Sequence, residues 1–143
     1  MVLSDEKKKE YMKRLLMSRL RILVNNGFYG LLLMHMIFSI DENCSTAATD
    51  GRRIYFGPVF LDDLSDSELD FIMMHEILHV ALKHCFRQGN RNNERFNIAC
   101  DIDFTFQFLL CFAEFFHSSK VLFGIIEIDV SVRIYGTKYR NVP

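Results

Sequence analysis

One stretch of the chain constrains the fold more than any other: residues 71–82 read FIMMHEILHVAL. Nine of these twelve residues are apolar, and the three polar ones are His75, Glu76 and His79. A helix that is apolar nearly all round is expected to be buried, so three polar side chains are predicted to lie in the core. Burying them without partners would cost several kcal/mol in total, and some interaction must therefore satisfy them.

The spacing of the two histidines indicates what that interaction is. At about 100° per residue, positions 75 and 79 lie roughly 40° apart and one turn above each other, so both imidazoles can reach one divalent ion. Zinc favours imidazole nitrogen, and a catalytic zinc keeps one position for water. Glu76 is placed to accept the proton of that water and to pass it to a leaving amine. The HExxH spacing predicts a zinc-hydrolase site; the alternative is a core helix whose histidines bond backbone carbonyls.

A third metal ligand has to come from another segment. Residues 93–116 predict a second apolar helix that carries a polar stripe at positions i, i+4 and i+8, namely Asn97, Asp101 and Thr105. Asp101 is central, and its carboxylate would offset part of the zinc charge. We therefore expect Asp101 to be the third ligand. The alternatives are that Asp101 faces solvent or caps a helix, with Asp103 or Glu114 available in its place.

Two further groups of residues compete for a role near the metal. His84 extends the motif to HExxHxxxxH, but on a continuous helix it would be rotated roughly 180° from His75. We interpret it as a residue that flanks the ligands or ends the helix. Cys85 and Cys100, with His79 or His84, would form a rival structural zinc site. Because the cysteines lack paired spacing, we interpret them as small buried hydrophobic residues.

The remaining elements have local signals. Apolar residues at helical spacing after Met12 predict an amphipathic helix that ends near residues 25–27, with its basic face interpreted as solvated. Ser65 and Glu68 match a capping box, which starts the HExxH helix at residue 66, and we expect that helix to reach about residue 86. Residues 52–56 and the alternating segment 126–134 predict strands.

These elements predict one α+β domain over residues 1–143. We expect it to be zincin-like, with a small sheet packed on the buried HExxH helix and on a second ligand-bearing helix. The strand over 52–56 is placed at the sheet edge beside the metal, where an extended peptide can add to it. His35, within an apolar run, is interpreted as a core histidine.

Composition excludes several classes of protein. A chain of 143 residues that is 50% apolar and 24% charged is long enough to fold around its own core. The formal net charge of −1 argues against nucleic-acid binding, and every apolar run is shorter than the ~20 residues of a membrane helix. Four cysteines without CxxC spacing or a secretory signal predict a cytoplasmic protein with reduced thiols.

Longer stretches of the chain resemble a known family. The segment TAATDGRRIYFGPVFLDDLSDSELDFIMMHEILHVALKHCFR and then FNIACDIDF are similar to the bacterial metallopeptidase domains that commonly precede a von Willebrand factor A-like domain. The resemblance covers about residues 10–105 and leaves 106–143 as a divergent C-terminal segment. Two departures concern Thr105, where the family tends to have Asn, and the missing von Willebrand-like segment.

The resemblance implies zinc bound by His75 and His79, Glu76 as catalytic base, and an acidic third ligand at Asp101. It also implies a peptide or protein substrate, and an ATPase or a von Willebrand factor A-like protein as partner. We therefore expect a zinc-dependent metallopeptidase. The competing hypotheses are a catalytically inactive metal-binding or assembly module, and another zinc-dependent hydrolase.

Overall fold

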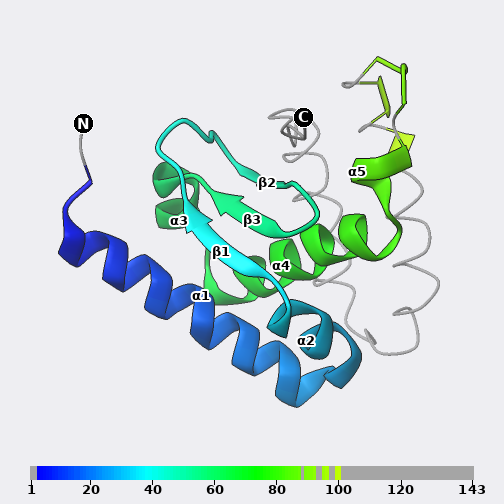
Figure 1. Ribbon diagram of the computed structural model, residues 1–143. Helices are drawn as coiled ribbons and strands as arrows, with labels where there is room; N and C mark the ends of the chain where they lie inside the picture. Colours follow the sequence, from blue (N-terminus) through cyan, green and yellow to red (C-terminus); the bar gives the residue numbers. More distant parts are fainter. Residues whose placement is uncertain (1–2, 88, 93–94, 97–98, 101–143) are drawn as a thin grey trace, which may run out of the picture.

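The chain combines helices with a small sheet in an α+β arrangement (Figure 1), as the sequence predicts. The computed structural model describes residues 3–87, 89–92, 95–96 and 99–100. The elements of this part are, in order, α1 Asp5–Asn25, α2 Gly27–Met34, β1 Ile37–Ile40, β2 Ala47–Thr49, β3 Arg53–Phe56, α3 Pro58–Asp63, α4 Asp66–Ala81 and α5 His84–Arg87. Most of the predicted helix over 93–116 and the whole predicted strand over 126–134 lie outside the described residues.

The sheet has three strands in the order β1-β3-β2. β1 pairs in parallel with β3, from Ile37 opposite Arg53 to Ile40 opposite Phe56, and β2 pairs antiparallel with β3. The prediction that residues 52–56 form a sheet edge is therefore wrong. The apolar run before residue 40 supplies β1 on one side of β3, so both sides of β3 are already hydrogen-bonded and an incoming peptide cannot add to it.

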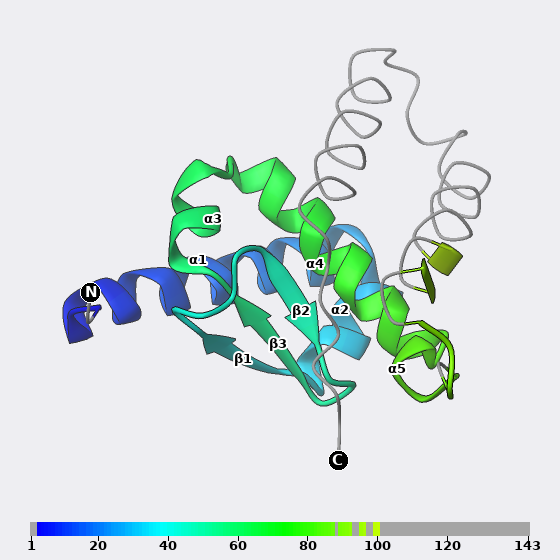
Figure 2. The ribbon, with the colours of Figure 1, turned by 90° about the horizontal axis from the view of Figure 1, so that it is seen from above.

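The two long helices contact the sheet, α1 at β1 and α4 at β2, and they also contact each other (Figure 2). α1 forms an amphipathic helix because its buried positions recur every three or four residues: Tyr11, Leu15, Ser18 and Ile22. The core then runs from this face of α1 across the sheet to α4. None of the helices in the described ranges has the length and apolar character needed to cross a membrane.

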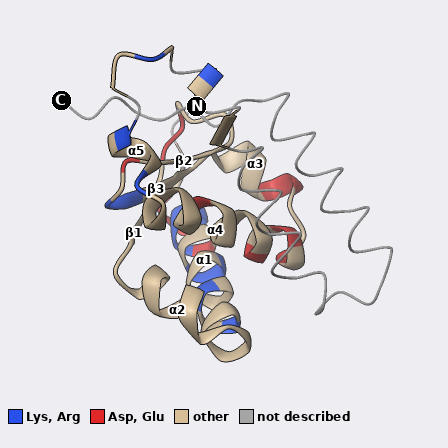
Figure 3. Ribbon diagram, turned by 90° about the vertical axis from the view of Figure 1, so that its right-hand side faces the viewer, with Lys and Arg blue, Asp and Glu red and all other residues tan. Residues whose placement is uncertain are grey.

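The basic side chains of α1 only partly face solvent. The Arg14 guanidinium donates to the backbone carbonyls of Leu61 and Leu64 and lies 3.2 Å from Asp66. These partners belong to the segment where α3 ends and α4 begins, around which acidic residues gather (Figure 3). The prediction of a wholly solvated basic face is therefore wrong at Arg14, because its partners are supplied from about 50 residues further along the chain.

A second contact about two turns along α1 fixes the same helix pair. Arg21 donates two hydrogen bonds to Asp70, of 2.7 and 2.9 Å, and the Ser18 hydroxyl donates to the same carboxylate. The hydrogen bond to Asp70 is the main reason why the pKa of Arg21 is raised above its ordinary value. Both side chains are more than two-thirds buried, so water screens this ion pair less than a fully exposed one. The contact holds the first turns of α4 against α1.

We predict that Asp70→Ala lowers the free energy of unfolding by about 2 kcal/mol, because it removes three hydrogen bonds that involve a charged group. Urea denaturation followed by circular dichroism measures the change. The matched control is Asp63→Ala, at an exposed aspartate of α3, for which we expect a change within about 0.5 kcal/mol. Equal effects of the two substitutions would contradict the role given to Asp70.

Candidate metal centre

The helix that carries the motif begins where its cap predicts. Ser65 is the N-cap of α4: its hydroxyl accepts from the Glu68 backbone N–H at 3.4 Å, and the Glu68 carboxylate accepts from the Ser65 backbone N–H at 2.7 Å. The hydrogen bonds from the side chain and backbone of Ser65 lower the pKa of Glu68. The predicted capping box is therefore confirmed, and it places residues 75–79 in the last turns of α4.

All three polar side chains of the motif are buried. His75, Glu76 and His79 are each only 1% exposed. The same helix buries apolar side chains around them: Leu69, Phe71, Ile72, Met73 and Ile77. The prediction of a buried, nearly all-apolar helix is thus confirmed, and the interior holds two imidazoles and a carboxyl group.

The two imidazoles of the motif point their Nε2 atoms toward each other. The His75 and His79 Nε2 atoms are 2.8 Å apart, and the ring centroids are 4.5 Å apart at an interplanar angle of 71°. Two nitrogens of a tetrahedral zinc site lie roughly 3.3 Å apart, so a small rotation of either ring would open the gap enough for an ion. These two nitrogens are chemically and geometrically suited to hold one metal.

Glu76 brings a negative charge close to a thiol. Burial raises the pKa of the Cys85 thiol to about 11, and the next largest cause is the charge of Glu76. Cys85 therefore keeps its proton at neutral pH, and its Sγ lies 3.8 Å from the carbonyl oxygen of Thr49 in β2. The charge of Glu76 thus acts on Cys85 of α5, which follows the end of α4.

The sequence predicts that the HExxH helix reaches about residue 86, but the helix ends earlier in the structure. α4 ends at Ala81, Leu82 caps it, and Lys83 has a φ of +57°, in the left-handed region that non-glycine residues rarely adopt. The chain then turns into α5, which begins at His84. Neither glycine nor proline marks this break, so the sequence carries no local signal for it.

The break brings a third histidine to the pair. His84 is 3% exposed, and its Nδ1 lies 2.9 Å from Nδ1 of His79. On the continuous helix that the sequence predicts, His84 would point away from the metal ligands. The structure instead places His84 against the ring of His79, on the side opposite His75.

The third metal ligand is not found in the part of the chain that the structure describes. There, no group of three or more His, Cys, Asp or Glu side chains is arranged to hold a metal ion. The rival site made from Cys85, Cys100 and a histidine is therefore not assembled, although all of its members are described. Asp101 lies outside the described residues, as do Asn97, Asp103, Thr105 and Glu114, so its role as third ligand stays a prediction.

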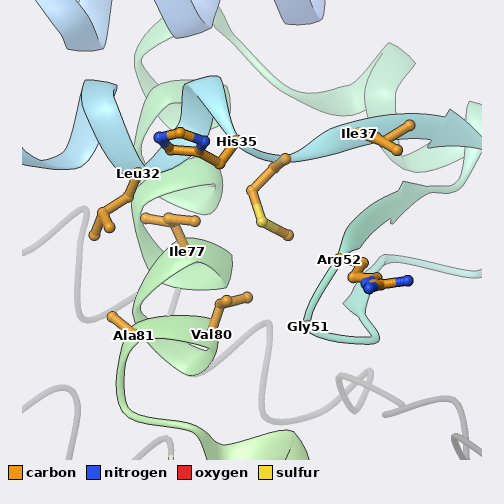
Figure 4. A pocket seen from close by; sticks show the side chains of 9 residues that line it. Leu32, His35, Ile37, Gly51, Arg52, Ile77, Val80 and Ala81 are labelled. Carbon is orange, nitrogen blue, oxygen red and sulfur yellow. The ribbon is translucent and has the colours of Figure 1, made fainter.

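A cavity of about 400 Å³ opens elsewhere on α4 (Figure 4). It lies between α2 and the face of α4 that carries Ile77 and Val80, and none of the three polar residues of the motif lines it. His35 lines this cavity as an exposed residue at the end of α2, so its interpretation as a core histidine is wrong. The mostly apolar lining offers no second group of metal ligands.

Residues 10–109 of the chain match a protein family described as "Putative metallopeptidase domain". This range contains the whole HExxH helix, the α1–α4 contacts and the sheet. A search of curated proteins and a search of solved structures give no significant match. A metallopeptidase family implies a metal cofactor, and the facing imidazoles are the described residues that fit one.

We predict that Lys83→Gly raises the free energy of unfolding by about 0.5–1 kcal/mol. Glycine removes the ~1–2 kcal/mol penalty of the left-handed conformation but adds about 0.5–1 kcal/mol of chain entropy on folding. Urea denaturation measures the change. The matched control is Lys13→Gly, at an exposed lysine inside α1, which should lower the same free energy by about 1 kcal/mol. Loss of stability in both variants would contradict strain at Lys83.

Proposed function

The chain belongs to the metallopeptidase-domain family, and we propose that it is a zinc-dependent peptidase whose metal is held by His75, His79 and Asp101. The observation that carries the proposal is the 2.8 Å approach of the two buried Nε2 atoms, one helical turn apart. A metal ion between them would satisfy both imidazoles in an interior that otherwise penalises polar groups. Asp101 enters as the acidic third ligand because it follows the described segment at the central position of a polar stripe.

When bound, zinc lowers the pKa of a coordinated water and polarises the carbonyl of the peptide bond to be cleaved. The chain supplies the proton transfer. A carboxylate oxygen of Glu76 would accept a proton from the attacking water and deliver it to the nitrogen of the leaving amine. Glu76 is suited to both steps, because a buried carboxylate next to the ligand His75 interacts strongly with charge in a medium of low dielectric constant.

Aromatic side chains lie near the histidines of this site. The Phe71 ring lies 6.4 Å from the ring of His75, measured between centroids, and the Phe96 ring lies at the same distance from His84. Peptide or protein is the proposed substrate, and an ATPase or von Willebrand factor A-like protein is the proposed partner. Both extend the family description and are independent of the metal test below.

We predict that the purified protein binds about one zinc ion per chain and that His75→Ala, His79→Ala and Asp101→Ala each lose it. Plasma mass spectrometry of the dialysed protein measures metal content. Removal of the metal by a chelator should lower the free energy of unfolding of the wild-type protein by about 2.7 kcal/mol, compared with the same protein in free zinc at one hundred times the Kd. The matched control is His35→Ala, at the exposed histidine of α2, which should keep its zinc. Full zinc content in His79→Ala would refute the proposed site.

We predict that Glu76→Gln leaves zinc content unchanged and lowers kcat for peptide hydrolysis by about 10²–10⁴-fold, because glutamine cannot accept the proton. Hydrolysis of a mixed peptide library, followed by mass spectrometry, measures the rate. Glu6→Gln, at an exposed residue of α1, is the control and should leave the rate unchanged. Zinc-loaded wild type that cleaves no peptide would favour the alternative functions: a metal-binding assembly module, or a zinc hydrolase for another substrate.

A further inference from the structure

We infer that His84 is a positioning residue that accepts a hydrogen bond from Nδ1–H of His79 and so directs the Nε2 lone pair of His79 toward His75. This inference rests on the proposed metal site. The observation behind it is that both nitrogens of His79 are engaged, Nδ1 by His84 at 2.9 Å and Nε2 by His75 at 2.8 Å.

The proton count decides the direction of the bond. A neutral imidazole carries one N–H and one lone pair. If His79 binds a metal through Nε2, its proton must sit on Nδ1, which faces Nδ1 of His84. His84 then accepts through Nδ1 and carries its own proton on Nε2. The opposite direction would place the proton of His79 on Nε2, where it would block the metal.

The position of His84 is held from several sides. The backbone N–H groups of Phe86 and Arg87 donate to the carbonyl of Lys83 at 3.0 and 3.1 Å, which closes the turn of α5. Cys85 anchors α5 to β2 through the carbonyl of Thr49. A strained φ persists only where the surroundings fix it, and at Lys83 these contacts do so. The strain thus serves to bring Nδ1 of His84 beside Nδ1 of His79.

The geometry separates this role from that of a ligand. Nδ1 of His84 approaches the nitrogen of His79 that points away from His75, so the three imidazoles form a chain and do not surround one point. The absence of any three-residue metal group within the described residues agrees with this arrangement. Hydrogen bonds to the far nitrogen of a ligating histidine raise its basicity and fix its ring, and their loss typically weakens metal binding by about 10–100-fold.

Two variants of similar size test the acceptor. In His84→Asn the side-chain oxygen can take the place of Nδ1, whereas His84→Leu fills the space without an acceptor. Competition with a chromophoric chelator gives the zinc Kd of each full-length variant. We expect His84→Leu to weaken zinc binding by about 10–100-fold and His84→Asn to stay within about threefold of wild type. His35→Leu is the matched control for a histidine-to-leucine change and should bind as wild type does.

Two outcomes of this titration would overturn the inference. Wild-type affinity in His84→Leu would show that the contact does not matter for the metal. Complete loss of zinc in both variants, with a changed visible spectrum of the cobalt-substituted protein, would make His84 a ligand. Circular dichroism in the presence of chelator verifies that each variant folds. If His84→Leu does not fold, His84→Gln takes its place, because its side-chain oxygen cannot occupy the Nδ1 position. Wild-type zinc affinity in His84→Gln would likewise overturn the inference.

A spectroscopic measurement separates failure of this inference from failure of the proposed function. In ¹⁵N-labelled protein, a scalar coupling between Nδ1 of His79 and Nδ1 of His84, with the proton on His79, supports the positioning contact. Its absence overturns it. The coupling can be measured with or without zinc, so wild type that takes up no zinc would refute the metallopeptidase function while the coupling still tests the hydrogen bond.

Discussion

The structure depends on the burial of three polar side chains inside an apolar helix. His75, Glu76 and His79 are each 1% exposed, so water cannot satisfy them, and each must find its partner in the protein or in a bound ion. The two histidines meet at Nε2, and the far side of His79 meets His84. Chains of hydrogen bonds in an interior of low dielectric constant stabilise a structure only when every member is paired. The fold around α4 is therefore constrained by the geometry of this polar group as much as by apolar packing.

The packing of α4 explains how this geometry is maintained. Its N-terminus is fixed by the Ser65–Glu68 capping box, and its first turns are tied to α1 through Asp70. The helix also packs on β2 and leads into α5. His75 and His79 lie in the last turns of this helix, just before the chain turns into α5. A helix held in this way cannot rotate or slide without breaking charged hydrogen bonds, which keeps its polar side chains in register with the residues that meet them.

Sequence alone predicts the parts of this arrangement that rest on local spacing. The capping box and the one-turn offset of His75 and His79 follow from residues at most four positions apart. The buried helix follows from one run of twelve residues, and all three features are observed. The central place of β3 and the pairing of Arg14 depend on segments distant in the chain, for which spacing carries no information. The end of α4 cannot be predicted from spacing for another reason: Lys83 adopts a conformation that its residue type disfavours, so propensity predicts the opposite of what tertiary contacts impose.

The left-handed conformation of Lys83 bears on function. A lysine at φ +57° costs about 1–2 kcal/mol that a glycine would not, and the chain gains from it the approach of His84 to His79. A continuous helix would be less strained locally but would turn His84 away from His79. At Lys83, the placement of a polar side chain thus outweighs the conformational preference of the residue itself. Strain of this kind is concentrated at functional sites, and here it lies directly beside the histidines to which the metal is assigned.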